Sequence, residues 1–457
     1  MKILITGATG LIGKELGKVL FQQGHHIVVV TRNRSKAIRE LPFPCQILEG
    51  DLGKSPLTQP ISVDAVFHLL GESIANGRWT KKAKQEILQS RVQSTLHLNQ
   101  SLTSSVKFYL CASGIGIYGN RPGEILSEQS AGDDSFLSRV CQEWEKSADS
   151  FSKVCPEATI AKLRIGLVLS KTGGALEKML FPFKAGVGGP LGSGKHYGSW
   201  IHIQDLIGIM LLALDRKISG AINGCSPESA INRDFSRTLA QVLNRPLGPS
   251  IPRAALNLLF GEMASILFDD QNAIPKKILD AGYAFRFPNL NLAFKDLLCD
   301  QIGTQEIFVT EQYLPIKAET LFKFFSDAKN LESITPPSLK FHIVKISSTE
   351  MKSGVEIDYR LKIYGLPVKW KTRIQEWEPN KKFVDTQLKG PYSLWHHTHE
   401  FVPWGEGTLM KDSVKFRLPL GYLGWLAGSH FVRSDVAKIF AFRRDYVGRL
   451  LTEMLKT

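Results

Sequence analysis

Three glycines near the N-terminus have the spacing of a phosphate-binding turn. Gly7, Gly10 and Gly13 follow a short apolar stretch, Lys2–Thr6, and precede a stretch of helical periodicity, Lys14–Gln23. Glycines at this spacing let the backbone approach a pyrophosphate closely, and the helix N-terminus supplies N–H groups and a positive dipole end. The sequence therefore predicts a dinucleotide-binding turn, the alternative being a glycine-rich turn without a ligand. The candidate cofactor-binding residues of the turn are Gly7, Thr9, Gly10, Leu11, Ile12 and Gly13.

The end of the second predicted strand, His26–Thr31, indicates which dinucleotide is bound. NAD enzymes usually place Asp or Glu there to hold the ribose hydroxyls. Residues 27–39 contain no acid. Arg32, assisted by Arg34 or Lys36, can instead pair with a 2′-phosphate. The sequence thus favours NADP over NAD, the alternative being a solvated basic loop.

Asp51 and Leu52 follow a third predicted strand and are further cofactor candidates. Asp51 can accept a hydrogen bond from the adenine amino group, or it can be a turn aspartate that bonds its own backbone. The residues alone favour neither role.

The elements that position these residues alternate between strand and helix. Two more short apolar stretches, Ala65–Leu70 and Phe108–Ala112, flank a long polar helix at Lys81–Leu102, and Ala158–Leu169 adds another strand. Fully apolar strands of this kind are buried on both faces, and the alternation implies right-handed βαβ crossovers. The sequence predicts an α/β Rossmann-type doubly wound parallel sheet. The Gly-rich loops and Pro-punctuated helices of residues 173–298 are typical of a small substrate lobe added to such a sheet.

After about residue 304 the periodicity changes to two. Apolar and charged residues alternate over 355–363 and 369–374, which is typical of antiparallel strands with one solvent-facing side. With two short helices, Ala318–Asp327 and Ala328–Ile334, the pattern predicts a curved sheet wrapped around a long C-terminal helix. We expect residues 1–300 and 304–457 to fold as separate domains. The apolar positions of the long helix are Val436, Ile439, Phe440, Val447, Leu450, Leu451 and Met454.

Composition restricts the classes of partner. The net charge of +14 is spread over the chain, with +6 from residue 301 onward and +8 before it. No basic tract forms, which argues against nucleic acid. The six cysteines are scattered without a Cys-x-x-Cys pair, which argues against a zinc site or a disulfide framework. Charged residues or prolines interrupt every apolar run, so we expect no membrane span and a cytoplasmic protein.

Several motifs together resemble the extended short-chain dehydrogenase/reductases. The glycine turn, Gly50-Asp51-Leu52 and Ile117-Tyr118-Gly119 are similar to that group. More distinctive segments resemble its atypical branch of NAD-dependent epimerase/dehydratase relatives, often labelled "epimerase family protein". These segments are Leu70-Gly71-Glu72-Ser73-Ile74, Arg78-Trp79-Thr80, Ser90-Arg91-Val92, Gly188-Gly189-Pro190-Leu191-Gly192-Ser193-Gly194 and Ser199-Trp200-Ile201-His202-Ile203.

The C-terminal part resembles the START-like (SRPBCC, polyketide-cyclase type) helix-grip domains. The resemblance is carried by Ile334-Thr335-Pro336-Pro337 and by Gly390-Pro391-Tyr392 leading to Trp395-His396-His397-Thr398-His399. In this family such a domain can be fused to the reductase part. The combined resemblance implies further cofactor contacts, and our candidates from it and its neighbourhood are Thr31, Arg32, Leu69, Leu70, Gly71, Glu86, Arg91, Arg164 and Val168.

The usual catalytic pair of short-chain reductases is missing. In that pair, Tyr-x-x-x-Lys, the lysine lowers the pKa of the tyrosine so that the phenol can exchange a proton. No tyrosine lies between Tyr118 and Tyr197, and Pro122 stands where Tyr118 would need its lysine. Substitute acids are Ser113, Tyr118 and His202. For Tyr118 the alternative is packing beside the cofactor, and for His202 it is a structural histidine at a helix start.

The second domain contains histidines and aromatic residues that invite a ligand. Alternation places His397 and His399 on one face of a strand, but no matching Cys or carboxylate set accompanies them in the sequence, so we expect no metal. Aromatic side chains can form a core or line a cavity for an apolar ligand. They are Phe324, Phe325, Tyr364, Trp370, Trp377, Trp395 and Trp404.

Two functions fit the sequence. The first is an NADP-dependent oxidoreductase or epimerase-like enzyme that acts on a small carbonyl or hydroxyl compound, with a C-terminal domain for a hydrophobic ligand. The second is a binding protein that senses NADPH and couples it to a hydrophobic ligand or partner without turnover. The glycine turn supports both, and the missing Tyr-x-x-x-Lys pair favours the second. The intact nicotinamide-side segment and the substrate lobe favour the first, and of the two we favour the enzyme.

Overall fold

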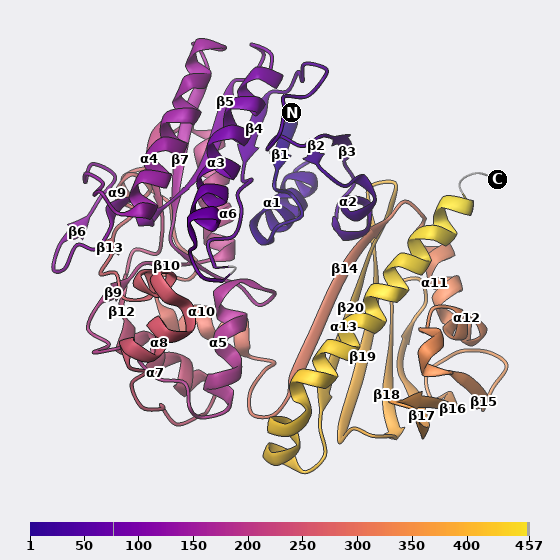
Figure 1. Ribbon diagram of the computed structural model, residues 1–457. Coiled ribbons are helices and arrows are strands. Elements are labelled where there is room, and N and C mark those ends of the chain that lie inside the picture. The colour runs from indigo at the N-terminus through magenta and orange to yellow at the C-terminus, as the bar shows by residue number, and fades with distance from the viewer. Residues whose placement is uncertain (76, 455–457) are drawn as a thin grey trace. The chain divides into compact units, whose positions relative to one another are not determined.

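The computed structural model describes residues 1–75 and 77–454 (Figure 1). The chain divides into two compact units, and each is described by itself. The first contains Met1–Arg34 and Cys45–Cys299, and the second contains Ser35–Pro44 and Asp300–Thr457. No helix among the described residues is long and apolar enough to cross a membrane.

A seven-stranded parallel sheet forms the centre of the first unit. Its order is β11-β7-β5-β4-β1-β2-β3, so the order of strands reverses between β1 and β4. In open α/β sheets this reversal is where ligands bind, outside the carboxyl ends of the strands. The strands are β1 (Lys2–Thr6), β2 (His26–Thr31), β3 (Gln46–Glu49), β4 (Ala65–His68), β5 (Phe108–Gly114), β7 (Thr159–Ile165) and β11 (Gly220–Gly224).

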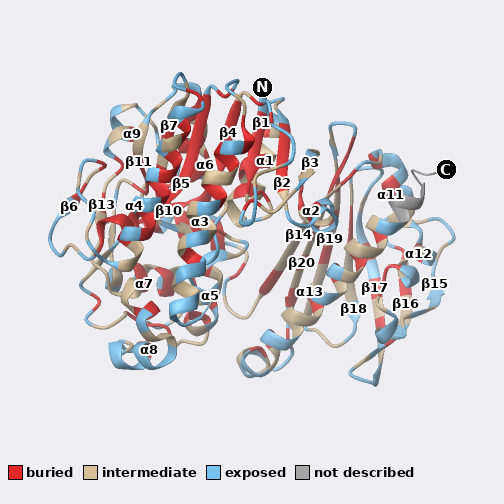
Figure 2. Cartoon of the chain, turned by 45° about the horizontal axis from the view of Figure 1, so that its top comes forward, coloured by how far each residue is buried: buried red, intermediate tan, exposed pale blue. Residues whose placement is uncertain are grey.

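Helices cover both faces of this sheet, which leaves its central strands buried (Figure 2). The predicted parallel sheet is confirmed, and the apolar strands have the burial that was inferred for them. The helices that lie along the sheet are α1 (Leu11–Gln22), α3 (Lys81–Ser101), α4 (Phe136–Asp149) with η2 (Ser150–Lys153), α6 (Ile203–Asp215) and α9 (Lys276–Asp280). Helix α2 (Arg34–Glu40) belongs, apart from Arg34, to the second unit.

One predicted strand is two strands in the structure. Residues 159–169 break at Gly166, where a Cβ atom would lie 2.8 Å from the Ser199 carbonyl oxygen. The chain leaves the main sheet at this close approach, and β8 (Leu167–Leu169) pairs with β10 (Trp200–His202) instead. A continuous apolar run gave no sign of this change of partner.

The small lobe after β8 has its own apolar core. Phe183, Trp200, Phe235 and Phe294 are among its buried residues. Its elements are α5 (Gly174–Lys184), α7 (Asn232–Val242), α8 (Arg253–Phe260), η3 (Gly261–Leu267) and α10 (Leu290–Leu298), and short segments nearby are η1 (Ile115–Tyr118), β6 (Ile125–Leu126), β9 (Tyr197–Gly198), β12 (Ala230–Ile231) and β13 (Asn272–Ala273).

The second unit is an antiparallel sheet with one long helix across it. The order β14-β20-β19-β18-β17-β16-β15 places the first strand beside the last. The predicted plan of one strand, two short helices, six strands and a long helix is confirmed. Of the apolar positions predicted for the long helix, the side chains of Leu450, Leu451 and Met454 lie outside the described part. The elements are β14 (Glu306–Leu314), α11 (Ala318–Ser326), α12 (Ala328–Ser333), η4 (Pro337–Leu339), β15 (His342–Ile346), β16 (Glu356–Ile363), β17 (Leu366–Glu378), β18 (Lys382–Lys389), β19 (Leu394–Trp404), β20 (Gly407–Arg417) and α13 (Gly421–Met454).

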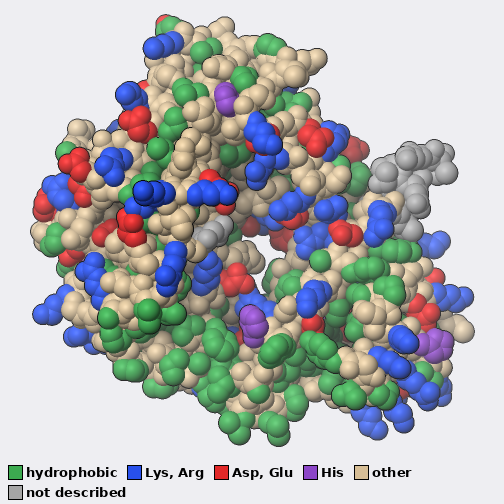
Figure 3. Space-filling view, in the orientation of Figure 1, with side chains coloured by type: hydrophobic (Ala, Val, Ile, Leu, Met, Phe, Trp, Pro, Cys, Tyr) green, Lys and Arg blue, Asp and Glu red, His purple; other side chains and the backbone are tan. Residues whose placement is uncertain are grey.

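Charged side chains of both signs are mixed over the face seen in Figure 3, where Lys and Arg lie scattered among Asp and Glu. This agrees with the even spread of the net charge of +14 along the sequence. A scattered positive charge supplies a weak general field rather than a local binding surface.

We predict that residues 1–300 and 304–457 fold when expressed separately, because each range contains its own apolar core. Circular dichroism and cooperative thermal unfolding of each fragment test this. Fragments that remain unfolded at several choices of boundary would contradict the division.

Candidate functional site

The turn after β1 requires glycine at two positions. Gly7 has a φ of +69°, and a Cβ atom there would lie 2.7 Å from the Leu69 carbonyl oxygen. A Cβ atom at Gly13 would lie 2.5 Å from the Gly7 carbonyl oxygen. Gly10 is the N-cap of α1, and no described side chain caps this helix. The first N–H groups of α1 are therefore available to an anion such as a pyrophosphate.

A buried histidine holds the ends of β1 and β4 together. His68 Nδ1 lies 2.7 Å from the Thr6 hydroxyl, and its Nε2 lies 3.0 Å from the Thr95 hydroxyl on α3. Burial lowers the pKa of His68 to about 3, so the ring is neutral at physiological pH. Sequence reasoning missed this residue, and its only signal was a polar side chain at the end of an apolar strand.

The loop after β4 rests on an arginine from α3. A Cβ atom at Gly71 would lie 3.1 Å from the Arg91 guanidinium carbon, which itself lies 5.0 Å from the centre of the Trp144 ring. Leu69 and Leu70, half-buried, belong to this loop. The structure thus brings four predicted cofactor residues together beside the glycine turn. Glu86 is exposed on α3 and lies 3.8 Å from Lys82.

The loop after β2 leaves one arginine uncommitted. Arg32 is exposed and has no hydrogen bond or ion pair to another described residue. Arg34 donates to the Ile47 carbonyl oxygen at 2.8 Å, and Thr31 bonds with Asn33. Arg32 is therefore the side chain of this loop best placed to meet a 2′-phosphate.

Asp51 forms a turn of its own in this structure. Its carboxylate accepts from the Gly53 N–H at 3.1 Å, which is the turn role that the sequence allowed. Leu52 is buried in the apolar core. Val168 lies near the first residue of α1, because the Val168 carbonyl and the Leu11 side chain both approach Gly174.

Ser113 and Tyr118 belong to one buried polar network. The Ser113 hydroxyl donates to Glu145 Oε1 at 2.8 Å, and both oxygens of that carboxylate accept from Arg164, each at 2.9 Å. Arg164 also donates to the Tyr118 hydroxyl at 3.0 Å, and that hydroxyl donates to Asn223 at 2.7 Å. Burial raises the pKa of Tyr118. The side chains of Ser113, Tyr118 and Arg164 therefore each have a protein partner already. Arg164 directs its hydrogen-bond donors to other groups of this buried network.

His202 begins helix α6. Its Nδ1 accepts from the Gln204 N–H at 3.1 Å, its Nε2 lies 3.3 Å from Asp296, and its ring packs 3.8 Å from the ring of Phe287. Burial lowers the pKa of His202. These contacts are the structural role weighed for His202 from the sequence, and the catalytic role stays a prediction.

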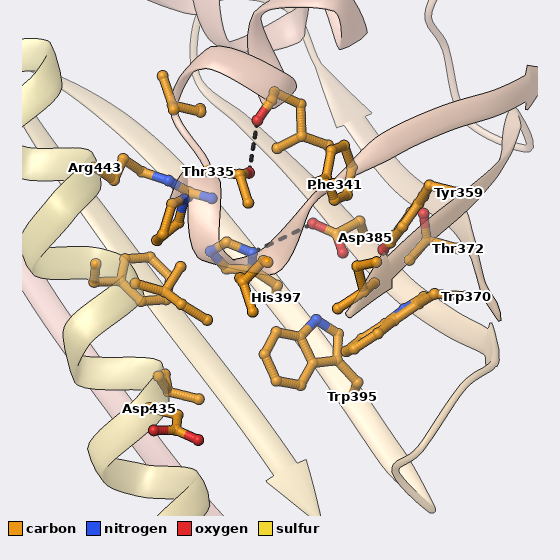
Figure 4. A pocket seen from close by; sticks show the side chains of 18 of the residues that line it. Thr335, Phe341, Tyr359, Trp370, Thr372, Asp385, Trp395, His397, Asp435 and Arg443 are labelled. Carbon is orange, nitrogen blue, oxygen red and sulfur yellow. Dashed lines mark hydrogen bonds and ion pairs between the residues drawn. The ribbon is translucent and has the colours of Figure 1, made fainter. Parts of the chain in front are cut away.

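The second unit encloses a cavity of about 600 Å³ between the sheet and α13. Figure 4 shows Trp370, Trp395, Tyr359 and Phe341 along one side of it. Large apolar side chains line most of the wall, as in sites for small hydrophobic ligands. Tyr364 and Phe431 line the cavity and are also exposed, at 75% and 62%, so its mouth is apolar too.

A buried cluster of charged residues lies on the wall of this cavity. Asp385 on β18 stands opposite His397 on β19, and Asp412 on β20 stands opposite His399. All four side chains are largely buried, and Arg443 from α13 places its Nη1 3.6 Å from Asp412. The sequence argument against a metal assumed that no carboxylates accompany the histidines, and the structure supplies two.

The cluster has opposite effects on its two histidines. Burial, together with the neighbouring His399, lowers the pKa of His397 to about 4. Burial also acts to lower the pKa of His399, but the carboxylates of Asp385 and Asp412 outweigh it and raise that pKa.

Comparison with known proteins accounts for both units. Residues 3–139 match the NAD dependent epimerase/dehydratase family, and residues 314–434 match the polyketide cyclase / dehydrase and lipid transport family. Residues 251–297 match a domain of unknown function, DUF1731. The human epimerase family protein SDR39U1 is 34% identical over 310 residues, which are 65% of this chain and all of that protein. The chain belongs to this epimerase family.

Two solved structures match about two thirds of this chain. A crystal structure of human epimerase family protein SDR39U1 with NADPH is 32% identical, with a TM-score of 0.59 over 65% of this chain and 99% of that one. A UDP-glucuronic acid 4-epimerase from Bacillus cereus in complex with UDP-glucuronic acid and NAD shares the fold alone, at 20% identity and a TM-score of 0.53 over 65% of this chain and 97% of that one. The epimerase fold and the appended helix-grip sheet expected from the sequence are both present.

The roles of His202 can be separated by two substitutions. His202→Asn retains a side-chain acceptor at the N-cap and His202→Ala does not, so we expect the Asn variant to be more stable by about 1 kcal/mol. Urea denaturation of both variants measures the difference. If His202 is also a general acid, both variants lose turnover by about 10²–10⁴-fold with unchanged NADPH affinity. An active His202→Asn variant would remove His202 from the mechanism.

Proposed function

We propose that this epimerase-family protein binds NADP(H) and is an oxidoreductase for a small carbonyl or hydroxyl compound. One observation carries the cofactor assignment: the uncapped N-terminus of α1 lies at the strand-order reversal, and the loop after β2 offers Arg32 in place of an acid. The helix end suits the pyrophosphate and the arginine suits a 2′-phosphate. The NADPH in the human relative's structure supports this assignment.

The reaction proposed is hydride transfer between the nicotinamide and a carbonyl carbon, with a proton supplied to or taken from the oxygen. Ser113 is the candidate to hold that oxygen, because it is the last residue but one of β5, the strand next to β4 in the sheet. To donate to a substrate it must release Glu145, which Arg164 would still hold through two hydrogen bonds. Tyr118 and His202 remain the other proton-donor candidates.

A specific observation favours the second function, an NADPH sensor without turnover. Ser113, Tyr118 and His202 are all buried, and the Ser113 and Tyr118 hydroxyls already donate to protein groups. An enzyme would have to break one of these hydrogen bonds to use Ser113 or Tyr118, whereas His202 Nε2 has no hydrogen-bond partner among the described groups. A screen of carbonyl compounds for NADPH consumption distinguishes the two functions, since tight NADPH binding without any turnover favours the sensor.

For the second unit we propose an apolar, partly aromatic ligand. The cavity of about 600 Å³ has room for a molecule the size of a small polycycle or a short acyl chain. The match to the polyketide cyclase / dehydrase and lipid transport family supports a hydrophobic ligand. The exposed aromatic mouth gives such a ligand a path from solvent.

We predict that Arg32→Ala weakens NADPH binding by about 1–3 kcal/mol and leaves NADH binding nearly unchanged, because only NADPH carries the 2′-phosphate. Fluorescence titration of both cofactors measures this. Arg237→Ala is a charge-matched control, since Arg237 pairs with Asp234, three residues earlier on α7, and with no other residue that the structure describes. Equal affinities of the unmodified protein for NADPH and NADH would contradict the assignment of NADP.

We predict that filling the cavity abolishes binding of apolar probes. Val436→Trp places a large ring inside the cavity from α13, and Leu361→Trp does so from the sheet, so both should weaken an environment-sensitive naphthalene probe by about tenfold or more. Ala441→Trp is the control, because Ala441 is exposed on the same helix and does not line the cavity. Unchanged probe binding in both cavity variants would place the ligand elsewhere.

A further inference from the structure

The buried histidine and aspartate cluster of the second unit is short of hydrogen bonds. Asp385 Oδ2 lies 3.4 Å from His397 Nδ1 and 3.4 Å from His399 Nε2. On the other side, Asp412 Oδ1 accepts a hydrogen bond from His397 Nε2 at 3.0 Å and lies 2.9 Å from His399 Nδ1. Among the described side chains, His399 Nδ1 has no partner in hydrogen-bond geometry, and this nitrogen faces Asp412, whereas Nε2 of the same ring faces Asp385.

A metal ion would take the place of a proton in this cluster. Asp385 and Asp412 raise the pKa of His399, so the charged imidazolium balances the carboxylates when no metal is bound. A metal-binding imidazole must be neutral, and a divalent cation then supplies the positive charge that the lost proton carried. The case for a metal therefore rests on the positions of the ligand atoms.

The spacing of the three atoms fits a metal ion. Ligand atoms about 2.0–2.2 Å from a tetrahedral zinc ion are separated from one another by roughly 3.3–3.6 Å. The two measured oxygen-to-nitrogen separations are 3.4 Å, and the ligand atoms of Asp385, His397 and His399 all lie within 4.8 Å of one another. Two imidazoles and one carboxylate suit divalent zinc, iron or cobalt.

The surroundings provide what bound metals usually require. A metal-binding histidine generally presents its other nitrogen to a carboxylate, which fixes the orientation of the ring. Asp412 lies against the outer nitrogen of both rings, and Arg443 Nη1 lies 3.6 Å from Asp412 Oδ1. Asp385, His397 and His399 line the cavity, whereas Asp412 does not.

We infer that Asp385, His397 and His399 bind a divalent transition-metal ion, with an open coordination position that faces the apolar cavity. Three protein ligands and one open position are the arrangement of metal sites that act on a ligand rather than hold a fold. An oxygen atom of the cavity ligand, such as a carboxylate or an enolate, completes the coordination. The part of this inference that concerns the ligand rests on the proposed function, and the metal site itself does not.

The test uses the full chain, free of any histidine tag and stripped with a chelator, and titrates it with Co²⁺. We expect one Co²⁺ per chain with the visible absorption of a four- or five-coordinate ion. Asp385→Asn and His397→Gln should abolish this absorption. Asp412→Asn should weaken Co²⁺ binding by about 10–100-fold, the usual effect of removing an outer partner.

His396→Gln is the matched control, because His396 lies on the same strand with its side chain on the other face and does not line the cavity. It should bind Co²⁺ as the unmodified protein does. If Asp385→Asn fails to fold, the unmodified protein still decides, since Co²⁺ must shift the ring resonances of His397 and His399 far more than those of His396. No stoichiometric Co²⁺, or binding that survives His397→Gln, would overturn the inference.

The role of the ligand is tested separately. A naphthalene carboxylate should bind more tightly with Zn²⁺ present, by about tenfold or more, while its methyl ester should not respond to the metal. If both compounds bind and Zn²⁺ changes the affinity of neither, the cavity is still a ligand site, but the proposed contact between the metal and the ligand is overturned. Co²⁺ binding without binding of either naphthalene compound would instead contradict the proposed apolar ligand and leave the metal site standing.

Discussion

The close approach of the Gly7 backbone to the Leu69 carbonyl is the constraint on which the nucleotide site depends. It brings the carboxyl ends of β1 and β4 together at the reversal of strand order, where a Cβ atom at Gly7 would lie 2.7 Å from that carbonyl oxygen. His68 reinforces the approach, because its two ring nitrogens contact Thr6 on β1 and Thr95 on α3. The N-terminus of α1 then opens beside the β4 loop that rests on Arg91.

Both units place buried polar groups next to apolar walls, and in each the polar groups are held by long-range partners. Arg164, Glu145 and Tyr118 come from β7, α4 and η1, and their bonds leave few donors free. A satisfied network of this kind is rigid and costly to disturb. The Asp385–His399 cluster differs, because Asp385 Oδ2 lies 3.4 Å from a ring nitrogen of both His397 and His399, and all three residues line the cavity. Ligand atoms that converge beside a cavity can accept a bound ion, whereas the bonds of the Arg164 network are directed to one another.

Local pattern was enough to predict the architecture. Fully apolar strands alternating with helices indicated a parallel sheet, and period two after residue 304 indicated an antiparallel one, because side-chain periodicity is a local property of the backbone. The break at Gly166 was missed, since an apolar run does not show which neighbour a strand will pair with. Boundaries set by caps also shifted, as α1 begins at Leu11 and not at Lys14.

The partners of site residues were less accessible to sequence reasoning. Asp385 meets His397 only because β18 and β19 pair in one register, and a shift of one residue would turn the carboxylate to the other face. A signal did exist, because Asp412 shares one face of its strand with the apolar residues Met410, Val414 and Phe416. A charged residue on the buried face of a strand requires a partner, although the sequence does not name it.

The two candidate functions differ in what they demand of the two sites. Each site is built from residues of one unit, so cofactor binding and cavity binding are separate equilibria unless a conformational change links them. A sensor requires such a conformational change, and the coupling between the two sites is then reciprocal. The factor by which a cavity ligand changes the affinity for NADPH must equal the factor by which NADPH changes the affinity for that ligand. An enzyme needs no such coupling, but Ser113 or Tyr118 would have to exchange a protein partner for a substrate, and His202 would have to present its buried Nε2. The missing Tyr-x-x-x-Lys pair is therefore compatible with both functions, and the coupling free energy between the two sites is the quantity that separates them.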